Sequence, residues 1–233
     1  MTQFSNYSDI NAVMHKAATL LTLIENEYQK CLYEQLIRDK LLVEIKDFLT
    51  NLRTALDYLA KKIIKKNFPI RNSQSDFDNY MIQISVECKA IFLKFQPFKG
   101  NDWIKNFNTL TNENKHVTLV PQKRIECKEL KINSGGAGIS LGQGASIHLG
   151  HGASITMGNM TIPGGQTISP TNPALFIGNG TQIIVTWVSF NFDNKGISDL
   201  PENISALPFM KQCFQNIAGL IKEIEAAYPQ GAL

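Results

Sequence analysis

The feature that most constrains the fold is a stretch from Asp9 to Asn67 that contains neither glycine nor proline. Apolar residues recur along it at 3.6-residue spacing, which is typical of amphipathic α-helices that pack one face against other helices. A single helix of that length would extend for about 88 Å at 1.5 Å per residue, which is too long for a small globular domain. We therefore expect two helices here, with a break between about residues 31 and 39.

Three more helices are expected in the rest of the chain. One begins near Ser75 and stops before Pro97, because proline clashes with a continuing helix. A short one opens after Gly100, and the last spans about 205–228 with a further apolar stripe. Together these segments predict a helical bundle of about five helices.

The pattern changes to that of β-strands after residue 116. We expect strands at "VTLV" (117–120), "RIECKELKI" (124–132), "ALFIGNG" (174–180) and "QIIVTWVSFNF" (182–192). These segments alternate apolar and polar residues or are rich in β-branched and aromatic ones. The prediction is an α+β protein with three parts, namely a helical bundle in 1–116, an antiparallel β region in 117–195, and a C-terminal helix in 196–233 that completes the bundle.

Residues 136–159, "GAGISLGQGASIHLGHGASITMGN", repeat every eight positions. Because eight is even, each repeat keeps the same strand parity, with apolar residues at odd positions and Gly, Ser, Thr or His148 at most even ones. Glycine at each junction allows a turn with positive φ. The repeat fits a small β-solenoid or meander, or a hairpin arm that buries its apolar face against a second subunit. We expect a homo-oligomer formed through this insert; a surface extension without a role stays open.

Composition narrows the class of protein. The chain is 43% hydrophobic and 18% charged with a net charge of +3, which suits a globular core and is too weakly basic to indicate nucleic acid by itself. Its four cysteines have neither metal-ligand nor disulfide-framework spacing, so no metal and no cofactor are expected. Neither a signal peptide nor an apolar run of about 20 residues occurs, so we expect a cytoplasmic protein without a membrane partner.

Polar residues that could carry chemistry occur on the second helix and at the end of the fourth. The candidates are Arg53, Asp57, Asn112, Asn114, Lys115 and His116. A histidine beside cationic groups can act as a general acid and base, and Arg and Lys can hold phosphate. We expect catalytic roles for His116, Arg53 and Lys115, and substrate binding by the other three. The alternative is an ordinary Arg53–Asp57 ion pair on the helix face, with His116 bonded to a helix end.

A second basic signal, "KKIIKK" (61–66), ends the second helix. Cations are favoured at a helix C-terminus by the helix dipole, so a solvated helix end accounts for them. The alternative is a patch that contacts the RNA backbone.

Four short segments carry a resemblance to a known family. They are "LRTALDYLA" (52–60), "FPI" (68–70), "QPF" (96–98) and "NENKH" (112–116). In this order they resemble bacterial helical-bundle proteins that are similar to the HEPN superfamily, over about residues 1–120. The resemblance implies an often dimeric bundle from toxin or antiphage systems, many of whose members are metal-independent ribonucleases with an Arg-polar-spacer-His motif. Here Arg71-Asn72 begins such a motif, but no histidine follows within reach.

Three functions remain open at the level of the sequence. The first is a HEPN-like module of a bacterial defence or stress system that binds or cleaves RNA, with a possible partner protein in that system. The second is a non-enzymatic interaction or assembly protein that oligomerises through the β insert. The third is a small-ligand sensor with a pocket at the junction of bundle and sheet.

Overall fold

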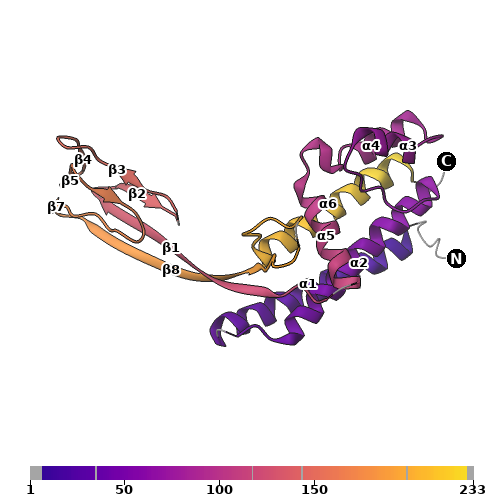
Figure 1. The fold of residues 1–233 in the computed structure, drawn as a ribbon, viewed down its shortest axis with the longest axis horizontal. Coiled ribbons are helices and arrows are strands. Elements are labelled where there is room, and N and C mark those ends of the chain that lie inside the picture. The colour runs from indigo at the N-terminus through magenta and orange to yellow at the C-terminus, as the bar shows by residue number, and fades with distance from the viewer. Residues whose placement is uncertain (1–6, 35, 117, 143, 198, 230–233) are drawn as a thin grey trace. The chain divides into compact units, whose positions relative to one another are not determined.

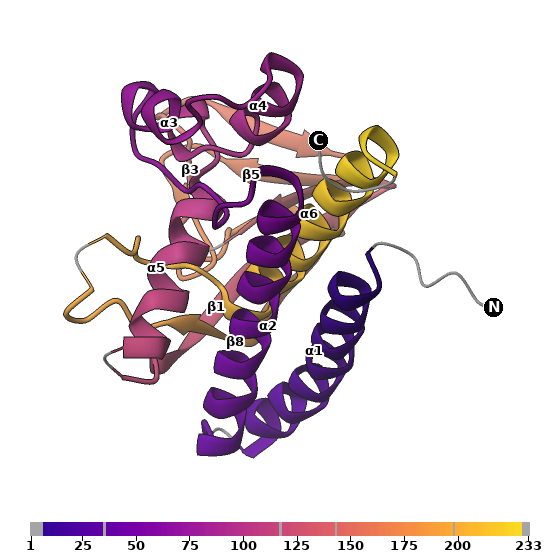
Figure 2. The same ribbon diagram turned by 90° about the vertical axis from the view of Figure 1, so that its right-hand side faces the viewer.

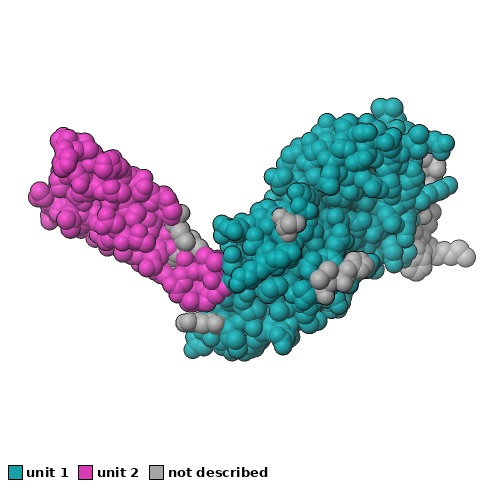
Figure 3. Space-filling model, viewed as in Figure 1, with its two compact units in different colours: residues 1–123, 190–233 teal, residues 124–189 magenta. Residues whose placement is uncertain are grey.

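The computed structural model describes residues 7–34, 36–116, 118–142, 144–197 and 199–229. It divides into two compact units, which Figure 3 distinguishes by colour. Residues 1–123 and 190–233 form a helical unit, and residues 124–189 form a β unit. The predicted α+β class is confirmed. Sequence analysis placed the corresponding boundaries after residues 116 and 195.

The described part of the helical unit forms six α-helices, against about five expected (Figure 1). They are α1 (Ser8–Glu34), α2 (Asp39–Ile64), α3 (Gln74–Tyr80), α4 (Val86–Leu93), α5 (Asp102–His116) and α6 (Ala206–Ala227), with a 3₁₀ turn η1 (Pro97–Lys99) between α4 and α5. α1 packs along α2, and α6 contacts α1, α2 and α5 (Figure 2). The break between the first two helices falls within the predicted interval.

The apolar stripe of α2 explains why this helix lies at the centre of the unit. Every residue of the predicted stripe is buried, namely Leu41, Ile45, Phe48, Leu52, Ala55, Leu56, Leu59 and Ile63. These side chains join those of the other helices in one hydrophobic cluster. The helix ends at Ile64, and the next residue, Lys65, has a left-handed backbone (φ 56°) and donates its N–H to the carbonyl of Lys61.

The single helix expected from Ser75 to Pro97 is wrong, because the structure has two short helices there. The Ser73 hydroxyl accepts the backbone N–H of Asp76 and caps α3. The Ser85 hydroxyl accepts the N–H of Cys88 and caps α4. Between them Gln83 has a left-handed backbone (φ 69°), which no helix interior accommodates. The apolar stripe runs on through both helices and hides the break.

The strands form three antiparallel sheets. Their bounds are β1 (Gln122–Ser134), β2 (Ala137–Leu141), β3 (Ile147–His148), β4 (Ser154–Met157), β5 (Met160–Pro163), β6 (Thr167–Ile168), β7 (Ile177–Gly178) and β8 (Thr181–Phe192). The strand orders are β2-β1-β8, β3-β6 and β4-β5-β7. The long strands β1 and β8 match the two strongest strand segments of the sequence.

Two of the expected strands differ from the structure. Residues 118–120 form no strand, and Val117 lies outside the described residues. The reason is local, since the side chain of Asn114 accepts the N–H of Val120 at 2.9 Å and holds this segment against the end of α5. In "ALFIGNG" only Ile177–Gly178 is a strand.

Each octapeptide contributes one strand. Leu141, Leu149 and Met157 occupy equivalent places in successive repeats and are each 8% exposed, in a cluster with residues of β1, β5 and β6. Junction glycines 136, 144 and 152 have φ of 84°, 79° and 86°. Within the described residues β2 pairs with β1, β3 with β6 and β4 with β5, so neighbouring repeats do not stack as in a solenoid. The isoleucines of the three octads are half-buried against the same cluster, and the alanines are exposed.

Candidate functional site

The sequence-predicted pair Arg53–Asp57 forms an ion pair on α2, with Arg53 Nε 3.2 Å from Asp57 Oδ2. Both groups also bind the chain beyond the helix. Arg53 Nη1 donates to Asn108 Oδ1 at 3.3 Å, and Nη2 donates to the Phe68 carbonyl at 3.4 Å. Asp57 Oδ1 accepts the Phe68 N–H at 2.9 Å. The pair therefore fastens α5 and the segment after α2 to α2 itself.

The candidates at the end of α5 separate into buried and exposed groups. Asn114 is buried, and its Nδ2 donates to the Leu110 carbonyl at 2.8 Å while its Oδ1 holds Val120. Asn112 and Lys115 are exposed. His116 is the last residue of α5. Its side chain is not among those described, so its predicted catalytic role stays a prediction. Among the described side chains no hydrogen bond or ion pair joins Arg53 to the other candidates on α5.

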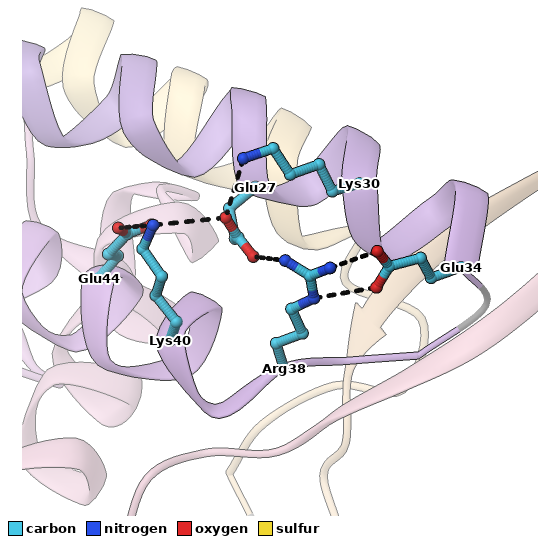
Figure 4. Close-up of polar contacts among 6 residues, drawn as sticks. All are labelled: Glu27, Lys30, Glu34, Arg38, Lys40 and Glu44. Atoms are coloured by element: carbon cyan, nitrogen blue, oxygen red, sulfur yellow. Dashed lines mark hydrogen bonds and ion pairs between the residues drawn. The ribbon is translucent and has the colours of Figure 1, made fainter.

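A cluster of charges surrounds a buried carboxylate at the turn between α1 and α2 (Figure 4). Glu27 is 2% exposed and accepts a hydrogen bond from Arg38 at 2.9 Å, with Lys40 at 3.5 Å and Lys30 at 3.7 Å. Burial by itself raises the pKa of Glu27, but the Arg38 hydrogen bond and the three positive charges outweigh it and lower the pKa. Arg38 also bonds Glu34 on α1. The cluster locks the turn and leaves its cations neutralised.

A different set of cations, at the other end of α2, forms no ion pair with the described carboxylates. We call it the basic surface, and its members are Lys61, Lys62, Lys65, Lys66 and Arg71, together with Tyr7, Tyr58 and Tyr80. Ten ion pairs join described side chains of this protein, and none involves any of these five cations. The positive charge of this surface is therefore uncompensated by contact, unlike that of the Glu27 cluster.

Tyrosine rings position three of these cations. Lys62 Nζ lies 5.4 Å from the Tyr7 ring centroid. Lys66 Nζ and Arg71 Cζ lie 5.2 and 4.1 Å from the Tyr80 ring centroid, within the range of cation–π attraction. Lys66 also donates to the Tyr80 carbonyl at 2.6 Å. Arg71 Nε is shielded from solvent and has no hydrogen-bond partner among the described residues. Two cations of the basic surface therefore contact the Tyr80 ring.

A groove of about 610 Å³ adjoins the basic surface, between the first turns of α1 and the last turns of α2. Lys61, Lys62 and Tyr58 line the α2 side of this groove, and Asp9 is an acidic residue on the α1 side. The Tyr58 side chain is 44% exposed and presents an aromatic ring to solvent. Cationic and aromatic side chains thus share one wall of an open groove.

Sequence analysis found the lysines of the basic surface but not their aromatic partners. Tyr58 could have been found, because it lies three and four residues before Lys61 and Lys62 and so shares their helix edge. Tyr7 precedes α1 and Tyr80 ends α3, and neither position has a spacing that links it to the end of α2. Only the tertiary packing brings these rings to the lysines.

The comparisons with known proteins give no family, since no family model, curated protein or solved structure matches the chain. No helix in the described ranges is long and apolar enough to cross a membrane. Within the same ranges no group of three or more His, Cys, Asp and Glu residues is placed to hold a metal ion. Any function must therefore be argued from the geometry of this chain.

Proposed function

We propose that the protein binds RNA through the basic surface at the end of α2. The observation that carries the proposal is the set of five cations without carboxylate partners, interleaved with three tyrosines. RNA phosphates supply the negative charge that the surface lacks, and their neutralisation releases counterions and favours binding. The exposed ring of Tyr58 adds base stacking, which tolerates any sequence because every base has a π-face.

The members of the surface have different roles in this proposal. Arg71 is held over the Tyr80 ring, which leaves its planar guanidinium oriented for bidentate binding of a phosphate. Lys61 and Lys65 are exposed and act as point charges along the RNA backbone. Tyr58, exposed beside the groove, is the stacking platform for a base.

The proposal is for binding rather than cleavage. Arg53, the expected phosphate-stabilising group, directs its guanidinium to Asp57, Asn108 and the Phe68 carbonyl. A phosphate at Arg53 would have to displace these contacts, whereas the cations of the basic surface need displace no carboxylate. In a bacterial defence or stress system such a module would bring RNA to a partner protein. Cys31, Cys88 and Cys213 are buried and unpaired, which supports a reducing, cytoplasmic setting.

The test is fluorescence anisotropy of a labelled single-stranded RNA of mixed sequence, titrated with the full chain over a range of salt concentrations. The slope of log affinity against log salt falls by about 0.7 per phosphate contact on a single strand. We expect Lys61→Gln with Lys65→Gln to weaken binding and make the slope shallower by roughly 1.4. Tyr58→Ala should cost about 1–3 kcal/mol of binding free energy through lost stacking, with the salt slope unchanged.

The matched control is Lys46→Gln with Lys105→Gln, which removes two positive charges that also have no ion-pair partner among the described residues. Lys46 lies on α2 at about 22 Å from Lys61 along the helix axis, beyond the Debye length at physiological salt. This control should bind like the unmodified protein. Absence of RNA binding at low salt, or equal weakening by both double variants, would contradict the proposal.

A further inference from the structure

Most of the β unit is made of a stretch of chain without Asp, Glu, Lys or Arg. No Asp, Glu, Lys or Arg occurs from Ile132 to Phe192. Over the full chain these residues make up 18% of the sequence. Surface charge normally keeps protein molecules apart in solution, and its absence favours association. Two copies of this region can therefore approach each other without like-charge repulsion.

The strand β8 presents a long free edge in this region. It spans Thr181–Phe192 and is the end strand in the order β2-β1-β8, so β1 occupies one of its two edges. On the other edge Asn191 bridges Ser205 and Phe192 donates its N–H to the Ile204 carbonyl, so the edge left free among the described residues is that of 181–189. Figure 1 shows β8 running alongside β1. Natural proteins usually protect an edge strand by shortening it or by placing lysine or proline on it. β8 contains no charged residue and no proline, so it lacks these protections.

Exposed apolar side chains of the β unit gather around the turn between β7 and β8. Leu175 is 76% exposed, Ile177 71%, Ile183 53% and Ile184 45%. Ile183 and Ile184 are neighbours in a strand and therefore point to opposite faces, so both faces of β8 are open there. In each octad the leucine or methionine is buried and the isoleucine is half-buried, whereas the alanine is exposed. The large apolar side chains that are exposed on the described β unit thus lie just before β7, on β7 and on β8.

We propose that β8 pairs in antiparallel orientation with β8 of a second copy of this chain, across a two-fold axis. A two-fold interface uses the same patch on both copies and so requires a surface that is complementary to itself. An uncharged edge meets this requirement, because each strand offers the other the same backbone donors and acceptors and no repelling side chain. β-branched side chains would then pack across the new strand pair. A strand of a charged partner would gain no electrostatic complement here.

The experiment measures the mass of the full chain by light scattering and sedimentation over a wide concentration range. The unmodified protein should reach about twice the chain mass of 26.0 kDa. Ile183→Lys and Ile184→Lys, tested separately, should each give a monomer, because each copy would bring a positive charge into an otherwise uncharged interface. Circular dichroism melting of each variant verifies that its helical unit is folded.

Two control variants locate the interface. Val86→Lys places the same charge on a side chain that is 77% exposed on α4, and it should leave the dimer intact. Ser154→Lys adds a lysine to the exposed face of an octad strand and should also leave it intact. A monomer at every concentration would overturn the proposal. A dimer that withstands both isoleucine variants, or one that only Ser154→Lys breaks, would overturn it as well.

Discussion

The helical unit and the β unit are each stabilised internally by different kinds of interaction. The helical unit buries aliphatic and aromatic side chains from all of its α-helices in one large cluster and surrounds it with ion pairs. The β unit has a small cluster of nine buried residues, and ion pairs among its described residues occur only along β1. Its turns depend on glycine with positive φ. The difference suggests a division of roles.

The division has a measurable consequence for binding. Contacts made by lysines on the helical unit are screened by salt, whereas contacts made by an uncharged strand edge are not. We therefore associate the salt-sensitive proposal, RNA binding, with α2, and the salt-insensitive one, self-pairing, with β8. If the two units are as separate in stability as they are in chemistry, a substitution in one unit should leave the stability of the other unchanged.

The largest effect is expected from truncation of the helical core. Leu52 is fully buried in α2, and Leu52→Ala should cost about 2–5 kcal/mol of unfolding free energy, because it leaves a cavity. The matched change in the β unit is Ile162→Ala, at an equally buried position on β5. It should weaken hydrogen-exchange protection in the β unit. The unfolding free energy of the helical unit, measured by its melting curve, should change by less than about 1 kcal/mol. If Ile162→Ala lowered the stability of the helical unit as much as it lowered hydrogen-exchange protection of the β unit, the two units would unfold as one.

The same comparison explains which parts of the fold could be predicted from the sequence. Phe48, Leu52 and Leu59 mark the buried face of α2 by spacing alone, because helix periodicity is a local property. The break between α3 and α4 was not, because it depends on a capping bond of Ser85 and a left-handed Gln83, which the apolar stripe does not record.

The candidate site likewise has some contacts that the sequence could predict and others that it could not. The spacing of Arg53 and Asp57 was sufficient to predict their ion pair. It could not reveal that both side chains bind Phe68, since that contact depends on how the chain turns after α2. Likewise Tyr80 reaches Lys66 only through the packing of α3. Contacts within one helix were predictable, and contacts between elements required the structure.

A smaller effect is expected from the junction glycines of the β unit. Gly144→Ala forces a side chain into a left-handed conformation (φ 79°) although nothing lies within 4 Å of the added methyl group. Backbone strain alone should therefore cost about 1–2 kcal/mol, seen as weaker hydrogen-exchange protection of the β unit. Gly142 has equally open surroundings and no positive φ, so Gly142→Ala should be neutral or slightly stabilising. Equal effects of the two changes would show that the turn does not depend on this glycine.

The subtlest effect is a change in how the helical unit responds to acid. The lowered pKa of Glu27 means that its ionised form stabilises the folded state. This contribution is complete above the ordinary value of 4.5 and is lost as the pH falls through the lowered folded-state pKa.

Glu27→Gln should therefore be less stable than the original protein at neutral pH, and its stability should fall less steeply on acidification, so that the two melting curves converge in acid. The control is Glu202→Gln, at an exposed position outside any ion pair of the described residues. It should follow the original protein at every pH, because no partner charge is lost. If the stability of Glu27→Gln fell as steeply on acidification as that of the original protein, other carboxylates would determine the response to acid. The ion pairs at the α1–α2 turn would then contribute geometry to the helical unit without contributing measurable stability.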